Sequence, residues 1–544
     1  MADANPLISR RLAIGLIATG AAGLAVMGCG PSGAQVVGER RRLDVRGFGA
    51  RGDGRADDTA AFQAAHDALT GGGVLAVGAG TYRVSRVNIA NRGVAVELAP
   101  DAVLRKLGEA GVPARGMFVV ENLLDAQFVL RGGRVDLNGE GPMGIGEPGR
   151  LRNLYAPLTI PSVTAIAGPA NAAVYALRSS HVTVSGVTIE NSGESGVLIR
   201  NCSDTLVEQC RFRNLAGYGV EWSMVAAGAD GGSGRVPDRA RNHVRGCSFE
   251  DFDDYGLGSG NGAGVGGGGS GAGWVRDFSV TDCTFLRCQS DINFEFTPGS
   301  GVIGLELARL RSRDARQAGF GLVGVRDAVV RDYVIVNPGA APTAALGPGW
   351  PSSHGGSLSS DFSEVRLIGV QVLDRRGGVS RIGSGGMIER GSRLFAAPGA
   401  RFAAADVGAF IGIRGANPRG VCYVGRIQRI VSPGEVELDL PAHTSVRGAD
   451  YAYGGACREG LRLFHGTSAS LEGCRIEAGV QSGLPGEPAA AGIRIENVRD
   501  PVAIGGTVVT APRGAAPVGI DLIRSTLSGT PQVSGFARSM VTRS

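Results

Sequence analysis

Residues 187–223 read VTIENSGESGVLIRNCSDTLVEQCRFRNLAGYGVEWS and contain the end of one repeat and the whole of the next. The repeat consists of an apolar residue, a larger apolar residue two positions on, a turn Asn, and then Gly-Val at the start of another alternating segment. Its positions recur after 23 residues, and the pairs are Val187 with Cys210, Ile189 with Phe212, Asn191 with Asn214, Gly196 with Gly219, and Val197 with Val220. One such unit cannot bury its own apolar face, so it must stack on similar units. The pattern therefore predicts a parallel β-solenoid.

The same pattern continues along the chain, although insertions separate some of the units. Later members are Cys247 with Phe249 and Gly256, Cys283 with Phe285, Leu310 with Gly319, then Tyr333 and Val370. A register kept over this many segments predicts an all-β, right-handed parallel β-helix with coils of about 23 residues.

The composition agrees with a folded solenoid. The 544 residues include 90 Gly and 25 Pro, but 43% are hydrophobic, which argues against disorder. The net charge is only +5, and the arginines are scattered and not gathered into a stripe with aromatic residues. Nucleic acid is therefore not an expected partner.

The first residues are typical of an export signal. Residues 9–28 begin with Ser-Arg-Arg and continue as an apolar run that ends in small residues. The two arginines resemble a twin-arginine signal, and Val26-Met27-Gly28-Cys29 resembles a lipobox, which implies that Cys29 is lipidated. Cleavage after Ala34 is the alternative. We expect an exported protein in the periplasm or on the cell surface, either lipid-anchored or secreted.

Residues 43–84 carry the motifs FGARGDG, DDTAAFQAA and GTYRV. An aspartate at 57 or 58 can cap a helix that places Phe62, Ala65 and Leu69 on one face, and this helix would cover the open end of the solenoid. The three motifs resemble the N-terminal region of the pectate-lyase-like β-helix superfamily, which includes polysaccharide lyases, polygalacturonases and tailspike-like proteins. The resemblance implies the β-helix fold and a polysaccharide as partner.

Four segments are expected. Residues 1–34 form the export signal and linker, 35–377 the cap and β-helix, 378–456 an inserted small β module, and 457–544 the last coils. The module is expected because the repeat breaks there into short strands around Pro433-Gly434. No terminal helix closes the far end, and a homotrimer is one arrangement that would cover it.

Three long insertions, 224–242, the Gly-rich 258–273 and 338–360, interrupt the regular coils, and the first two are expected to leave the same strand of neighbouring coils. Loops that leave one side of a solenoid usually build its binding face. We therefore expect a groove over residues 198–361. Trp350, in the third insertion, is a candidate for substrate binding.

Strand alternation places Glu221 on the outer face, because Val220 and Trp222 point inward. Counting by coils aligns Glu221 with Leu198, Gly258, Asn293 and Gly321, and one strand position further on it aligns Arg200, Ser223 and Glu295. Glu221 and Glu295 are candidate catalytic acids, and Arg200 and Asn293 are candidates for substrate binding. A pair of carboxyl groups is what glycoside hydrolysis needs.

Residues 249–262 read FEDFDDYGLGSGNG and offer Asp253 and Asp254 as further catalytic candidates. This segment resembles the paired-aspartate strand of polygalacturonases, and Ser353-His354-Gly355 resembles their His-Gly motif, which makes His354 a candidate. The Asn-Thr-Asp and Arg-Ile-Lys motifs of that family are missing, and the His-Gly motif comes about 100 residues after the aspartates. The other acid of the segment, Asp251, falls on a turn ladder with Asn191, Asn214, Asp314 and Asn337.

A polysaccharide lyase is the other enzymatic interpretation. It needs a cation to neutralise a uronic carboxylate and a base, for which Arg245, His243, Tyr218, Tyr255 and His354 are available. Arg245 and Tyr255 are also candidates for substrate binding. The leading hypothesis is an enzyme that cleaves an acidic polysaccharide by hydrolysis or β-elimination. The alternative is a non-catalytic carbohydrate-binding or tailspike-like adhesion protein. No cofactor is predicted, because the cysteines lack the spacing of metal ligands. Binding of a calcium ion is left as an alternative.

Overall fold

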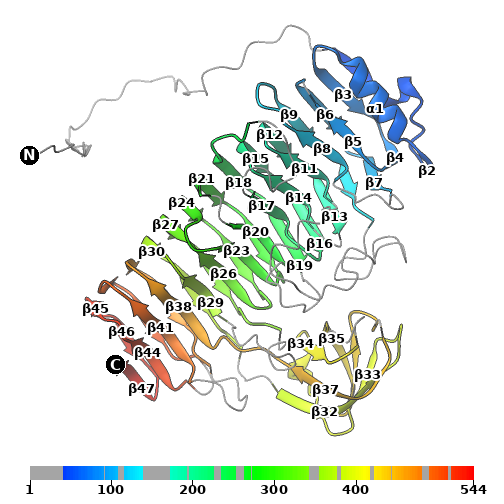
Figure 1. Cartoon of the computed structure of the whole chain (residues 1–544). Coiled ribbons are helices and arrows are strands. Elements are labelled where there is room, and N and C mark those ends of the chain that lie inside the picture. The colour runs from blue at the N-terminus through cyan, green and yellow to red at the C-terminus, as the bar shows by residue number, and fades with distance from the viewer. Residues whose placement is uncertain are drawn as a thin grey trace, which may run out of the picture. The chain divides into compact units, whose positions relative to one another are not determined.

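The structure, a computed structural model, describes most of the chain after residue 40 (Figure 1). The described residues are 41–90, 92–107, 116–138, 172–192, 195–225, 235–252, 262–270, 273–341, 354–376, 381–416, 422–442, 444–480, 489–512 and 516–544. The predicted export signal, residues 1–34 with Cys29, lies outside them.

Three long sheets of parallel strands form the described body of the molecule. Each coil contributes one strand to sheet A, one to sheet B and one to sheet C, in that order along the chain. Crossovers between parallel strands are right-handed because of strand twist. The predicted fold class, a right-handed parallel β-helix, is confirmed.

Within the described residues, sheet A has 14 strands and sheet B has 14. Sheet A consists of β1 (Arg42–Asp44), β3 (Gly73–Val77), β6 (Val94–Leu98), β9 (Phe128–Arg131), β12 (Ser180–Ser185), β15 (Ser203–Glu208), β18 (Ala240–Arg245), β21 (Trp274–Thr281), β24 (Gly301–Ala308), β27 (Val325–Arg331), β30 (Ser363–Ile368), β39 (Ala469–Glu472), β42 (Val502–Gly505) and β45 (Leu527–Ser528). Sheet B consists of β2 (Asp53–Asp57), β4 (Gly80–Val84), β7 (Ala102–Lys106), β10 (Arg134–Asp136), β13 (Thr188–Ser192), β16 (Arg211–Leu215), β19 (Ser248–Phe252), β22 (Thr284–Leu286), β25 (Arg311–Arg313), β28 (Val334–Val336), β31 (Gln371–Leu373), β40 (Arg475–Glu477), β43 (Val508–Thr510) and β46 (Gln532–Ser534).

Sheet C has 13 strands among the described residues, and it is the sheet on which the predicted site residues converge. It consists of β5 (Val87–Ile89), β8 (Phe118–Glu121), β11 (Val174–Leu177), β14 (Val197–Arg200), β17 (Val220–Val225), β20 (Ala263–Ser270), β23 (Ser290–Phe296), β26 (Ala318–Val323), β29 (His354–Ser359), β38 (Glu459–Gly466), β41 (Ala491–Val498), β44 (Val518–Ile523) and β47 (Arg538–Arg543).

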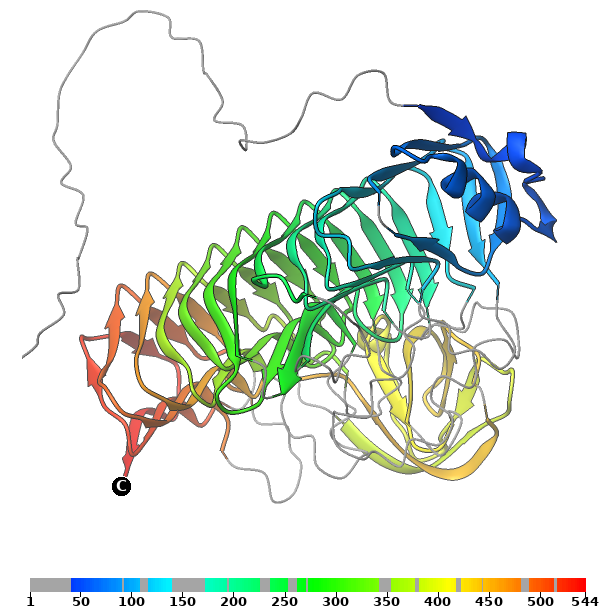
Figure 2. The same ribbon diagram turned by 45° about the horizontal axis from the view of Figure 1, so that its top comes forward.

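One α-helix lies in the described part of the chain, α1 (Thr59–Ala68), at the N-terminal end of the coils (Figures 1 and 2). Phe62, Ala65 and Leu69 are fully buried, as predicted for a capping helix. Asp58 occupies the N-cap position, and the carboxylate of the preceding Asp57 accepts a hydrogen bond from the Thr59 amide at 2.9 Å. A short 3-10 helix, η1 (Val45–Phe48), precedes α1.

A closed antiparallel barrel interrupts the coils between β31 and β38. Its strands are β32 (Arg381–Ile388), β33 (Leu394–Ala396), β34 (Phe410–Ile413), β35 (Tyr423–Ser432), β36 (Glu435–Leu438) and β37 (Val446–Tyr453), with the 3-10 helix η4 (Ala404–Asp406). The barrel has its own core, in which Phe395, Phe402 and Tyr451 pack together. The inserted small β module is therefore present.

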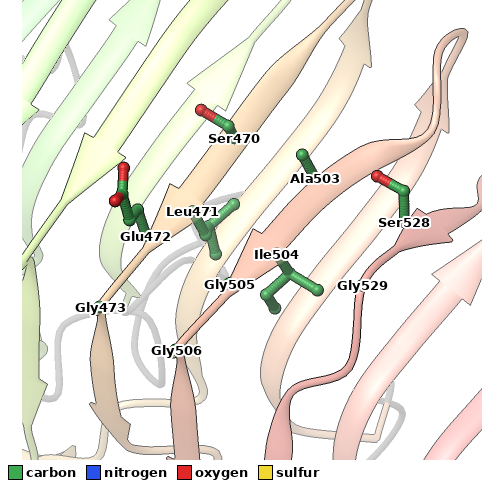
Figure 3. A pocket seen from close by; sticks show the side chains of 10 residues that line it. All are labelled: Ser470, Leu471, Glu472, Gly473, Ala503, Ile504, Gly505, Gly506, Ser528 and Gly529. Atoms are coloured by element: carbon green, nitrogen blue, oxygen red, sulfur yellow. The ribbon is translucent and has the colours of Figure 1, made fainter.

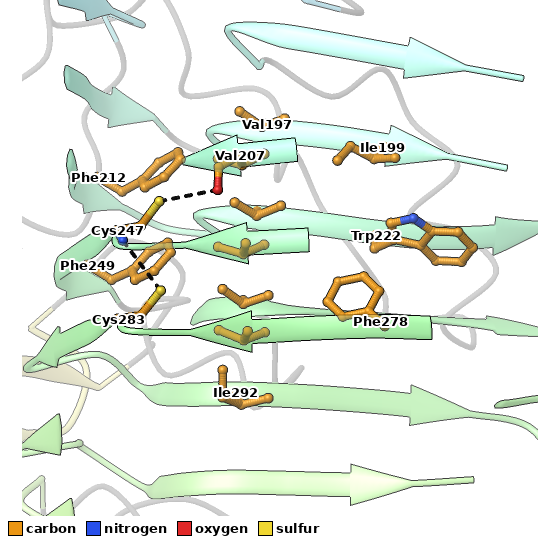
Figure 4. Close-up of a cluster of buried hydrophobic side chains, with 14 of the residues drawn as sticks. Val197, Ile199, Val207, Phe212, Trp222, Cys247, Phe249, Phe278, Cys283 and Ile292 are labelled. Carbon is orange, nitrogen blue, oxygen red and sulfur yellow. Dashed lines mark hydrogen bonds between the residues drawn. The ribbon is translucent and has the colours of Figure 1, made fainter. Parts of the chain in front are cut away.

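The core of the β-helix consists of side chains stacked in rows from coil to coil (Figure 4). Phe212, Phe249 and Phe285 stack with ring centroids 5.0 Å apart at both steps. Cys210, Cys247 and Cys283 form a second buried row, as predicted, in which free Cys acts as a small apolar residue.

A glycine row explains the Gly-Val signature of the repeat. A Cβ atom at Gly196, Gly219 or Gly264 would lie 2.6–2.8 Å from the ring of the phenylalanine in the next coil. Only glycine leaves room for the stacked rings at this position. The row also shows that Gly264-Val265 is the true counterpart of Gly219-Val220, because β20 pairs Val265 with Val220.

The expected Gly-rich insertion 258–273 is therefore wrong over half of its length, since β20 is a full strand of sheet C. The expectation that the first two insertions leave the same strand is wrong as well. The chain between β17 and β18 follows sheet C, whereas the chain between β19 and β20 precedes it. These two connections lie at opposite ends of the strands of sheet C.

Candidate functional site

The outer face of sheet C carries the predicted row of Glu221, but with a different glycine. Glu221 pairs with Gly266, Gly266 with Asn293, and Asn293 with Gly321. The sequence count assigned Gly258 in place of Gly266, because it overlooked the repeated Gly-Val pair eight residues later. Glu221 and Asn293 remain two coils apart, about 10 Å at the usual strand spacing.

The second predicted row lies two residues further along the same strands. Arg200 pairs with Ser223, Ser223 with Gly268, and Gly268 with Glu295. The structure thus brings four of the candidates, Glu221, Glu295, Asn293 and Arg200, to one face of one sheet. We estimate about 12 Å between the Cα atoms of Glu221 and Glu295, from two coil steps and two residues of strand.

Two glycines form the floor between these rows. A Cβ atom at Gly266 would lie 2.0 Å from the backbone oxygen of Asn293, and one at Gly268 would lie 2.0 Å from that of Glu295. Side chains are therefore excluded here by the close approach of β20 and β23. A stretch of strand without side chains therefore separates the two acidic positions, and the Tyr218 ring lies against it at Gly266.

Glu221 lies between two polar neighbours. The hydroxyl of Ser195 donates a hydrogen bond to its carboxylate, and Arg200 lies near enough to favour the charged form. Burial nevertheless dominates and raises the pKa of Glu221. Arg200 itself is held in place, because its Nε donates to the Ser223 hydroxyl at 3.0 Å and its guanidinium lies 5.9 Å from the Tyr175 ring centroid.

Glu295 has a simpler environment. The side-chain amide of Asn293 donates to its Oε1 at 3.1 Å, and burial raises the pKa of the carboxyl. Within the described residues no arginine or lysine forms a salt bridge with it. Two carboxyl groups with raised pKa values on one face are candidates for proton transfer.

His354 lies on the same sheet but further along it. It begins β29 and pairs with Ala318 on one side and Glu459 on the other. Burial lowers its pKa to about 4, so the imidazole is neutral at pH 7. Its coil is four steps from that of Glu221, about 19 Å at the usual spacing, so the two side chains do not form one catalytic pair.

The remaining predicted residues are not on this face or are not described. Arg245 belongs to β18 of sheet A, where its guanidinium pairs with Glu208 at 2.5 Å. The other predicted residues lie outside the described residues, namely Asp253, Asp254, Tyr255 and Trp350. Asp251 does belong to the turn ladder and is bound by Arg287 at 2.7 Å, which supports a structural role.

Sequence reasoning missed a second group of ionisable residues on sheet C. Arg462 pairs in register with Arg494, and Arg494 with Asp521. Glu459 completes the group by an ion pair with Arg494. The signal was the recurrence of Gly460, Gly492 and Gly519, which fixes the register of these strands in the same way as Gly219 fixes that of Glu221.

A buried acid also escaped prediction. Asp291 occupies the glycine row, since its neighbours Ser290 and Ile292 pair with Ala263 and Val265. Its carboxyl is fully buried and accepts a hydrogen bond from the Tyr333 hydroxyl at 2.8 Å. Burial raises the pKa of Asp291 to about 8. The acid fits because the next coil has Ser312 where the preceding three have phenylalanine.

Other features of the described residues lie away from this face. A hollow of about 640 Å³ lies beside strands β39, β42 and β45 of sheet A (Figure 3), and Glu472 is the one ionisable residue among those lining it. No group of three or more His, Cys, Asp or Glu in the described segments could hold a metal ion. No described helix is long and apolar enough to span a bilayer.

Two family models match the sequence. The model described as "Right handed beta helix region" matches residues 166–347, and the model described as "Rhamnogalacturonase A/epimerase, pectate lyase-like" matches residues 43–96. No curated protein sequence matches significantly.

Solved structures match over most of the chain at low identity. PfbA, a surface adhesin of Streptococcus pneumoniae, is 12% identical with a TM-score of 0.51, covering 89% of this chain and 92% of its own. The catalytic unit of a thermostable α-1,3-glucanase from Streptomyces thermodiastaticus is 12% identical with a TM-score of 0.51, covering 95% and 71%. The pre-mature gene product 12 of bacteriophage phi29 is 13% identical with a TM-score of 0.51, covering 92% and 56%.

At these identities the likeness concerns the fold, and it agrees with the three-sheet architecture and the N-terminal motifs. The family models that match residues 43–96 and 166–347, together with the three-sheet architecture, support the predicted resemblance to the pectate-lyase-like superfamily of right-handed parallel β-helix proteins.

Proposed function

We propose that this protein is an exported, polysaccharide-active β-helix protein that binds its substrate across the outer face of sheet C and cleaves glycosidic bonds there. The observation that carries the proposal is the pair Glu221 and Glu295, two half-buried carboxyl groups with raised pKa values on either side of the Gly266 and Gly268 floor.

The surroundings of the two acids support different roles. Arg200 favours the charged form of Glu221, whereas Glu295 has only the amide of Asn293 as a neighbouring donor. Glu295 is therefore the proposed general acid, which protonates the leaving oxygen, and Glu221 is the proposed base. The stereochemistry of the product would distinguish an inverting arrangement, in which a water molecule lies between the base and the sugar, from a retaining one.

β-Elimination is the alternative chemistry on the same face. It needs a base next to the sugar and a cation against the uronic carboxylate. Tyr218 is in position to be considered as base, because its ring lies against Gly266, 2.8 Å from where a Cβ atom would be. Arg200 would then be the neutralising cation.

The comparisons support a polysaccharide as partner without deciding between catalysis and binding. One similar structure is the catalytic unit of a glucanase, and another is a surface adhesin. Export is part of the proposal because of the predicted leader at residues 1–34.

The test is an assay of the full chain against a panel of acidic and neutral polysaccharides. New reducing ends report cleavage, and unsaturated-uronate absorbance in the same tubes separates elimination from hydrolysis. We expect reducing ends to rise and the Glu221→Gln variant to lose at least a hundredfold in rate. The matched control is Glu208→Gln in sheet A, which should keep the activity, since Glu208 is paired with Arg245 on another face.

A polysaccharide that binds without any new reducing ends would overturn the catalytic proposal. The protein would then be a carbohydrate-binding surface protein. Equal activity in Glu221→Gln and the wild type would place the catalytic site elsewhere.

A further inference from the structure

The inserted barrel (yellow in Figure 1) carries most of the exposed apolar side chains. Six large apolar side chains are exposed in the described part of the chain, and five of them belong to the barrel. These five are Ile382, Met387, Leu394, Val407 and Val431, each 38–50% exposed. The sixth, Met540, lies in β47 in the last coil. Single exposed apolar residues are normal on a protein surface, but their concentration on one small module indicates a contact surface.

Three of the five lie on one outer face of the barrel. Met387 in β32 pairs in register with Ala396 in β33, and Leu394 lies two residues before Ala396, on the same side of that strand. The intervening Phe395 points into the barrel core, so Leu394 and Ala396 point outward. Val431 lies in β35, two strands further round the barrel from β33. We call the surface formed by Met387, Leu394 and Val431 the barrel face.

Charged residues border the barrel face on two sides. On one side, the guanidinium of Arg447 in β37 binds the carboxylate of Glu389 at 3.0 Å. On the other side, Glu437 in β36 pairs in register with Leu394, and its carboxylate binds Arg429 of β35 at 2.7 Å. Each side therefore has one cation and one anion, with the apolar side chains between them. An apolar centre with a polar rim is the usual composition of a protein–protein interface.

The chemistry of the barrel face suits a protein better than a sugar. Ligand sites for small molecules are concave and lined in part by aromatic rings, whereas the outside of a closed barrel is convex. All the aromatic side chains in the described part of the barrel are buried, namely Phe395, Phe402, Phe410, Tyr423, Tyr451 and Tyr453. The exposed side chains are aliphatic, and they leave water by packing against apolar side chains of another protein surface.

We propose that the barrel face binds the same face of a second copy of this chain in a two-fold symmetric contact. In such a contact each patch faces itself, so the apolar centres meet. Three strand steps, about 14 Å, separate Arg447 from Glu437 in the order β37, β32, β33 and β36. A second copy in the reversed orientation therefore places Arg447 of each chain beside Glu437 of the other. This complementarity of charge favours a second copy as the partner, because no like charges are opposed.

The barrel face is small, so the expected assembly is a weak dimer whose population depends on concentration. Sedimentation velocity of the full chain over a series of concentrations measures the dissociation constant of this dimer. We expect the fraction of dimer to grow as the concentration of the chain rises. The inference does not depend on the proposed catalytic function, which the cleavage assay tests separately.

Leu394→Arg is the first variant, because it places a cation at the apolar centre in both copies. We expect it to raise the dissociation constant about tenfold or more. Met387→Arg is a second variant with the same expected effect. Both side chains are exposed, so the fold should be kept, and circular dichroism checks this. Met540→Arg is the matched control, since Met540 is 44% exposed outside the barrel, and it should dimerise like the wild type.

A chain that stays monomeric at every concentration would overturn the inference. A dimer that both folded barrel variants leave unchanged would overturn it as well. Loss of the dimer in Met540→Arg alone would place the contact at the end of the coils and not on the barrel. Cleavage by Leu394→Arg should equal that of the wild type, because Leu394 lies outside sheet C.

Discussion

The outer faces of sheets A and C use charged residues in opposite ways. Along sheet A and its edge, four acids each pair with an arginine of a neighbouring coil, and at least 37% of each of these arginine side chains is exposed. The pairs are Asp204–Arg241, Glu208–Arg245, Asp282–Arg309 and Glu306–Arg331. On sheet C, Glu221 and Glu295 are half-buried, and neither forms a salt bridge with another described residue.

The difference separates scaffold from site. Exposed, matched pairs cost little to form and help keep the coils in register. Buried groups without a matching charge are costly and shift pKa values, and such groups gather at functional sites. We therefore propose that sheet A is mainly a structural face and that sheet C carries the functional site.

The largest expected effect comes from exchanging one carboxyl for an amide on each face. We expect Glu295→Gln to lower the cleavage rate by about a hundredfold to ten thousandfold, because the proposed general acid is removed. Glu306→Gln in sheet A removes a surface partner of Arg331 and should leave the rate unchanged. Initial rates of reducing-end release measure both. Similar losses of cleavage rate in the two variants would contradict the distinction between the faces of sheets A and C.

The buried Asp291 at the start of β23 predicts a pH-dependent stability. Its folded pKa is raised to about 8, so its contribution to stability is fully present below the unfolded pKa of about 4 and is lost as the pH rises to about 8. Asp291→Asn abolishes this loss. The free energy of unfolding of the variant, relative to that of the wild type, should rise by on the order of 5 kcal/mol between pH 4 and pH 8. Above pH 8 this difference should stay constant.

Thermal unfolding midpoints measured from pH 4 to 9 test this. Asp282→Asn is the control at the edge of sheet A, where hydrogen bonding to Arg309 lowers the pKa of the acid, so its variant should gain nothing with rising pH. A flat difference between Asp291→Asn and the wild type would show that the carboxyl is not buried as described.

Two arginine-to-alanine substitutions, one on each sheet, extend the comparison to the stability of the fold. Arg494→Ala removes the buried guanidinium that Glu459 and Asp521 share, and it should destabilise the fold by about 3–5 kcal/mol. Arg241→Ala breaks an exposed pair with Asp204 in sheet A and should cost about 0–1 kcal/mol. Urea unfolding of the two variants side by side measures the difference. Equal costs would mean that burial does not distinguish the faces.

The fold was predictable because it follows from the inward rows. The positions of Cys210 and Phe212 recur in each coil, and stacking requires them to do so, so the rows could be counted directly from the sequence. The N-terminal helix was equally clear from its capping aspartate and apolar face. The Gly-rich strand β20 was missed because glycine favours loops, whereas here the strands on both sides leave no room for side chains.

The site was predictable only in part. Glu221, Asn293 and Glu295 share a face because strand alternation and coil counting are enough to place them there. The cluster around Arg462 follows an inserted barrel, where the count is lost. Asp291 was hidden because nothing local shows that Ser312 in the next coil makes room for it. Long-range packing, and not the local sequence pattern, decides where the Arg462 cluster and Asp291 lie.

The most direct test of the central claim is hydrogen exchange of the Glu221→Gln variant with and without the polysaccharide that the wild type binds. We predict slower exchange in peptides from β17, β20, β23, β26 and β29 of sheet C on binding, with no change in sheet A. Protection confined to sheet A or to the barrel, with sheet C unchanged, would contradict the assignment of the functional site to sheet C.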